Sequence, residues 1–157
     1  MTASGIGSRL LHGLLAGGAG TAALNVATYA DMTLRARPAS PIPERDVEVL
    51  AERASISLGE GEQADNRRSA AGALMGYLTG LTAGVAWAAV EPALGRLPTP
   101  VAAGVLGAGV MAATDASSAA LGTTDPRRWS PGDWLSDLVP HALFGIVTVA
   151  AYGALRE

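Results

Sequence analysis

Cysteine and lysine are absent from the 157-residue chain, and aromatic residues number only seven. Without cysteine there is no disulfide, thiolate metal site or cysteine nucleophile. A soluble domain of this length usually builds its core from more large side chains. The net charge is −3, and the arginines form no basic stripe, so we expect no nucleic-acid partner.

Long apolar runs rich in glycine and alanine make up most of the chain. A helix needs about 20 apolar residues to cross a bilayer. We therefore predict an all-α, four-transmembrane-helix bundle that forms a single integral membrane domain over 1–157. A secretory signal cleaved after Ala30 is the rival interpretation of the first run, which is long for a signal. The expected spans are about 10–34, 69–90, 101–122 and 131–155, with a polar loop over 35–68.

The first loop contains signals for one short amphipathic helix. Pro43 suits a first helical position, and the acidic residues just after it suit a first turn. Residues 59–66 are expected to form a flexible acidic loop before the second span. Pro92 is expected to close that span, and the short linker after it predicts that spans two and three are antiparallel neighbours. The apolar side of the amphipathic helix is Val47, Leu50, Ala51, Ala54 and Leu58.

Glycine recurs at strict four-residue intervals in the second span. Such small residues let two helices approach closely in lipid, and three overlapping GxxxG steps are a stronger signal than one. We expect these faces to mediate helix packing, self-assembly or partner binding. The residues concerned are Gly17, Gly72, Gly76, Gly80, Gly84 and Gly145.

The two halves of the chain resemble each other. A shift of 90 residues places Gly17 on Gly107 and Asn25 on Asp115, and a shift of 69 places 73–79 on 142–148. These matches predict two helical hairpins related as a parallel internal repeat. In the second copy Asp115 replaces Asn25, so that copy has gained an ionisable group.

The arginines are distributed unevenly between the two sides of the predicted bundle. Loops 35–68 and 123–130, with the adjoining span ends, hold eight, and the termini with the middle linker hold three. The positive-inside rule therefore predicts cytoplasmic loops, external termini and a location in the cytoplasmic (inner) membrane. Trp129 and Trp134 would lie at the cytoplasmic interface, with Trp87 and Tyr152 near the opposite one.

Polar residues concentrate in the cytoplasmic half of the predicted spans. Asp115 and His141 each lie about six residues from that interface, or roughly 9 Å of helix rise. Asp133 and Asp137 share a helical face with His141 but are expected nearer the first turn and the interface. The predicted intramembrane polar cluster is Asn25, Asp31, Tyr77, Asp115, Asp137 and His141.

Three interpretations of this cluster remain open. Asp115 can pair with His141 or Asn25 to hold weakly hydrophobic helices in register. Alternatively, buried Asp and His can carry protons or ions, which would make the chain a small oligomeric transporter or proton-conducting subunit. The third is an enzyme acting on lipid with Asp115 and His141 as acid and base.

We expect an accessory or scaffold subunit rather than an enzyme. No nucleophile motif, HExxH or P-loop occurs. The two histidines, one of them (His12) near the opposite face, do not make up a metal-ligand set, so no cofactor is expected. The expected partners are membrane lipid and either further copies of the chain or another membrane protein.

Two phrases of the sequence resemble a known group of proteins. These are AxYADMxLRxRPxSxxPE at 27–44 and PHxLFG at 140–145. With the overall composition, they are similar to uncharacterised small four-helix integral membrane proteins of high-GC bacteria. The resemblance implies a membrane fold and a bacterial source, and it implies no activity.

Overall fold

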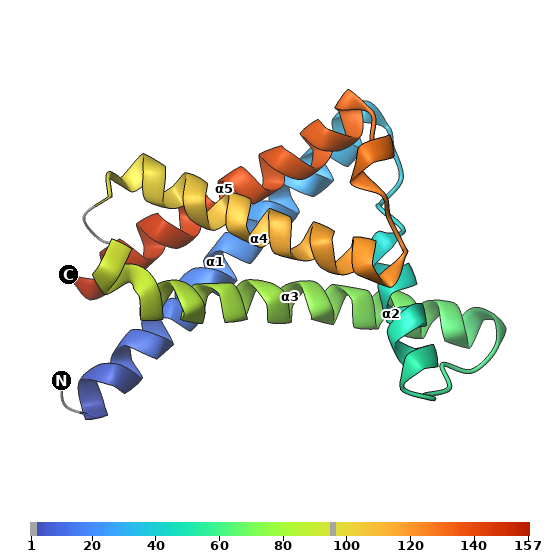
Figure 1. Ribbon diagram of the computed structural model, residues 1–157, viewed down its shortest axis with the longest axis horizontal. Coiled ribbons are helices and arrows are strands. Elements are labelled where there is room, and N and C mark those ends of the chain that lie inside the picture. Colours follow the sequence, from blue (N-terminus) through green and yellow to red (C-terminus); the bar gives the residue numbers. More distant parts are fainter. Residues whose placement is uncertain (1–2, 95–96) are drawn as a thin grey trace.

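Five α-helices and one short 3-10 helix make up the computed structural model, which describes residues 3–94 and 97–157 (Figure 1). Four of the helices are long and apolar enough to cross a membrane, which confirms the predicted all-α architecture and indicates a multi-pass membrane protein. No strand occurs among the described residues. The elements are α1 (Ala3–Arg35), α2 (Ile42–Arg53), α3 (Gly61–Leu94), α4 (Thr99–Leu121), η1 (Pro126–Arg128) and α5 (Pro131–Arg156).

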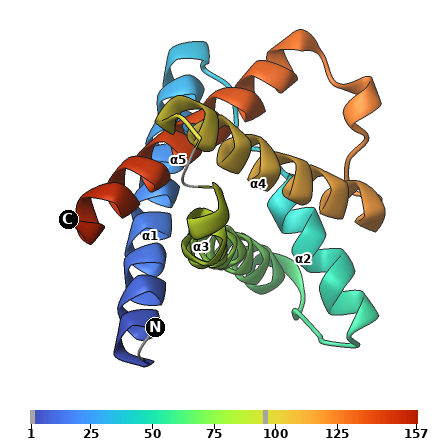
Figure 2. The same ribbon diagram turned by 60° about the vertical axis from the view of Figure 1, so that its left-hand side comes forward.

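The long helices form a bundle with one open seam. α1 packs against both α3 and α5, and α4 packs against α5, whereas α3 and α4 touch only marginally. The prediction that spans two and three are neighbours along their length is therefore wrong, because α3 turns its glycine face to α1 instead. In Figure 2 α3 is viewed nearly along its axis, with α1 on one side and α2 on the other.

Glycines allow the backbones of α1 and α3 to touch. A Cβ added at Gly84 would lie 2.6 Å from the Cα of Gly17, and one added at Gly13 would lie 2.6 Å from the carbonyl oxygen of Gly84. Gly80 lies against Thr21 of α1 in the same interface. Real Cβ atoms do not approach so closely, so only glycine fits at these positions.

The α4–α5 interface uses small residues in the same way. A Cβ at Gly145 would lie 2.8 Å from the backbone nitrogen of Gly107, and a Cβ at Gly107 would lie 2.5 Å from the carbonyl oxygen of His141. These contacts do not follow the register of the repeat alignment. That alignment pairs position 145 with Gly76, whereas the residues that Gly17 meets on α3 are Gly80 and Gly84.

Two glycines of the predicted packing set differ in environment from the rest. Gly72 lies against Pro43, so its packing partner is α2 and not a membrane-spanning helix. Gly76 has no heavy atom within 4 Å of the position of an added Cβ. Since α1 crosses α3 at Gly80 and Gly84, the glycine one turn earlier is left outside the interface.

α3 extends beyond both of its expected ends. Residues 61–66 are helical and not a loop, because an acid in the first turn and an Arg68–Asp65 ion pair stabilise this polar extension. Pro92 lies inside the helix instead of ending it. Proline lacks the N–H that the carbonyl of Ala88 would accept, and Arg9 of α1 donates to that carbonyl oxygen at 2.5 Å.

Trp87 and Tyr152 belong to the core and do not form an aromatic belt. They are 4% and 1% exposed, packed with Ala16, Ala88 and Val149 near the end of the bundle that carries both chain termini. Arg156 stacks on the ring of Tyr152 at 5.3 Å and pairs with Glu91 at 2.6 Å, which ties α5 to α3. The largest cluster of buried hydrophobic side chains therefore lies toward the half of the molecule that holds both termini.

Candidate functional site

Asp137 and His141 form the centre of a polar group on α5. They lie one helical turn apart, and His141 Nδ1 is 3.3 Å from the Oδ1 of Asp137. The same Nδ1 lies 2.9 Å from the carbonyl oxygen of Asp137. A carbonyl oxygen only accepts, so Nδ1 carries the hydrogen and Nε2 is the atom left to exchange protons. The His141 side chain is only 12% exposed.

Asp115 of α4 completes this group from the neighbouring helix. Its carboxyl lies near both the Asp137 carboxyl and His141. Oδ2 of Asp137 is buried and accepts no hydrogen bond from any described donor. Two carboxyls in contact can hydrogen-bond only when they share a proton. The Asp115–Asp137–His141 group therefore has the chemistry of a proton-binding site or of a structural link between α4 and α5.

The other predicted members of the polar cluster lie elsewhere. Asn25 is half-buried on α1 and is not among the groups that interact with Asp115, and Tyr77 is 49% exposed on α3. Asp31 lies near the end of α1, where Arg37 donates to it at 2.5 Å and Ser136 of α5 at 3.1 Å. The cluster is thus split, because helices that share a depth do not all turn their polar residues toward one another.

Asp46 is a buried polar residue that the sequence pattern did not single out. It is 7% exposed and accepts hydrogen bonds from the hydroxyl of Ser118, at 2.6 Å, and from that of Thr123. These bonds attach α2 to the end of α4. The available signal is its spacing, since Asp46 adjoins Val47 and lies five residues from Ala51 on the buried side of α2.

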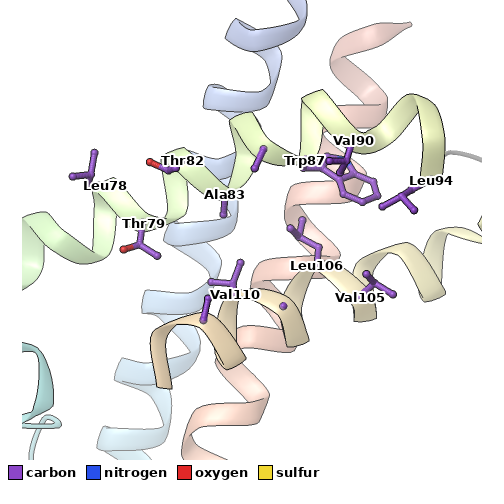
Figure 3. A pocket seen from close by; sticks show the side chains of 13 residues that line it. Leu78, Thr79, Thr82, Ala83, Trp87, Val90, Leu94, Val105, Leu106 and Val110 are labelled. Atoms are coloured by element: carbon purple, nitrogen blue, oxygen red, sulfur yellow. The ribbon is translucent and has the colours of Figure 1, made fainter. Parts of the chain in front are cut away.

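An open apolar groove separates α3 from α4 (Figure 3). It encloses about 490 Å³, and none of the described side chains that line it is charged. Trp87 and Leu94 of α3 lie at one end with Val105 of α4 across from them (Figure 3). Small residues, among them Ala83 and Gly109, form much of the remaining wall. The groove remains open because α3 packs on α1, α1 on α5 and α5 on α4, whereas α3 and α4 hardly touch.

The part of the chain that the structure describes holds no cluster of metal ligands. No group of three or more His, Asp or Glu side chains is placed there to hold a metal ion. No protein-family model, curated protein or solved structure matches the chain. Its function is therefore argued from its own residues.

Proposed function

We propose that the chain is an accessory or scaffold subunit of a membrane, whose α3–α4 groove binds a transmembrane helix of a partner membrane protein. The observation that supports this is the open, uncharged seam between two membrane-spanning helices. Apolar side chains that face a groove of this kind gain packing contacts when a third helix covers them.

The dimensions and lining of the groove fit a helix as the occupant. Its α3 wall runs from Leu78 to Leu94, about 24 Å of helix rise, which is most of the thickness of a bilayer core of about 30 Å. A single lipid chain reaches only about half that thickness. On the α4 wall, Gly109 has no heavy atom within 4 Å of an added Cβ, so α4 leaves room for a neighbouring helix to pack closely.

The absence of cysteine makes a crosslinking test direct. Thr82→Cys and Gly109→Cys place a photo-crosslinker on opposite walls of the groove, and Val26→Cys on the exposed side of α1 is the matched control. We expect both groove variants, and not the control, to capture the same membrane protein in native membranes. Gly109→Trp, which fills the groove, should abolish the capture from Thr82→Cys.

The same experiment separates the other occupants. A product of twice the chain mass would show that a second copy covers the groove, so the chain would be a self-assembling subunit. Products with lipid alone, or equal capture by the control, would contradict the proposal.

A proton- or ion-conducting subunit is the second candidate, and the Asp115–Asp137–His141 group supports it. Asp115→Asn removes one of the two carboxyls that could share a proton and keeps a side chain of similar shape. If the group conducts, this change abolishes proton flux in liposomes and leaves the folded bundle intact. If the group only links α4 to α5, neither form conducts and Asp115→Asn lowers thermal stability in detergent.

A further inference from the structure

The loop between α4 and α5 carries two highly exposed arginines. The side chains of Arg127 and Arg128 are 90% and 87% exposed, whereas their common partner Asp125 is 30% exposed. The hydrogen bond from Arg127 lowers the pKa of Asp125, so that carboxyl stays ionised and neutralises one of the two cations. Residues 122–130 therefore carry a net charge of +1, beside the exposed Asp133 in the first turn of α5.

A pair of tryptophans lies directly beside these arginines. Trp129 and Trp134 meet edge to face, with ring centroids 5.0 Å apart. Trp129 donates from its indole nitrogen to Thr124 at 2.9 Å, which fixes the ring, and Trp134 is 43% exposed. Exposed leucines follow on the same helix at Leu135 and Leu138. From η1 into the first turns of α5, the arginines are thus followed by two indole rings and then by exposed leucines.

This order matches the layers of a bilayer surface. α4 ends at Leu121 and α5 begins at Pro131, and both are candidate membrane spans, so the loop between them lies at the membrane interface. Tryptophan is enriched at the membrane–water interface. Arginine can form bidentate hydrogen bonds to the phosphate groups just outside it.

Arg35 at the end of α1 brings a further cation close to this surface, where its ion-pair partner is Asp31 at 3.4 Å. It donates to the carbonyl oxygen of Gly132 at 3.4 Å and to Ser136 at 2.5 Å. Figure 1 shows the end of α1 beside the start of α5, so Arg35 lies close to the first turn of α5.

We propose that Arg127, Arg128 and Trp134 form a surface that binds the headgroups of anionic phospholipids in the surrounding bilayer. The two guanidinium groups contact the phosphate and Trp134 lies at the glycerol level. This surface is remote from the α3–α4 groove and does not depend on the function proposed for it.

Native mass spectrometry of the full chain tests this surface. The protein is released from detergent micelles containing equal amounts of phosphatidylglycerol and phosphatidylethanolamine. We expect phosphatidylglycerol to be retained preferentially, and Arg127→Gln with Arg128→Gln to lower that retention by about fivefold per arginine. Arg45→Gln with Arg53→Gln removes the same charge from α2 and should leave retention unchanged.

Tryptophan fluorescence gives a second measurement that does not require a variant. Brominated phosphatidylglycerol should quench the exposed tryptophan more strongly than brominated phosphatidylethanolamine in the same mixed bilayer. Equal retention of the two lipids, an equal loss in both variant pairs, or equal quenching would overturn the proposal. Displacement of the lipid by inorganic phosphate alone would also overturn it, since the surface would then be a free-phosphate site.

Discussion

Individual polar residues decide how the helices of this protein are joined. Asp137 contacts His141 and lies near Asp115, although its position in the second turn of α5 predicts an interfacial residue. Asp133 does remain in the first turn, where it forms a capping box with Ser130. The difference depends on how α5 is rotated about its own axis relative to α4. The sequence of α5 alone does not specify that rotation.

Glycine positions in α3 provide a matched pair for mutation. A methyl group at Gly84 would collide with the backbone of α1, whereas one at Gly76 meets no heavy atom within 4 Å. We expect Gly84→Ala to destabilise the bundle by about 1–3 kcal/mol, the usual cost of overpacking. Gly76→Ala should be neutral or stabilise by up to about 1 kcal/mol, because alanine favours helix.

Unfolding of both variants in the same detergent, followed by circular dichroism, measures this difference. Equal loss of stability in the two variants would mean that α1 and α3 do not cross at Gly84.

At the scale of elements, α2 and Arg9 provide links that hold the long helices in place. α2 bridges the two helices that flank the seam, contacting Gly72 of α3 through Pro43 and Ser118 of α4 through Asp46. Its existence follows from amphipathic spacing, but its docking depends on Asp46, which the sequence pattern marks only as an acid of the first turn.

The contact between α1 and the end of α3 predicts a specific coupling. Arg9 donates to the Ala88 carbonyl that Pro92 leaves without an intrahelical donor. Arg9→Gln should therefore cost about 1.5–3 kcal/mol, the usual contribution of a hydrogen bond to a charged group. In a Pro92→Ala background the N–H of residue 92 supplies the missing bond, so the cost of Arg9→Gln should fall.

A double-mutant cycle in detergent measures this coupling energy. If the cost of Arg9→Gln is the same in both backgrounds, the arginine acts through some other contact and the proline is irrelevant to it.

At the scale of the whole molecule, the sequence predicts the number of spans but not their order of packing. Each span is defined by its own apolar length, so all four expected spans appear as helices, although α1 begins before residue 10 and α3 extends beyond both of its expected ends. Which helices become neighbours depends on how glycine faces match. Several spans carry such faces, and a single sequence does not specify the pairing that places α1 between α3 and α5.

The orientation of the molecule in the membrane follows from an asymmetry of the whole chain. Both termini lie at one end and the loops around α2 and η1 lie at the other (Figure 1). The loop end carries eight of the eleven arginines, so we predict that it is cytoplasmic. In intact cells a membrane-impermeant maleimide should label Glu157→Cys, whereas Ser57→Cys, exposed between α2 and α3, should react only after lysis. The reverse pattern would place the arginine-rich loops outside, and the basis for an inward-facing anionic-lipid surface at Arg127 would be removed.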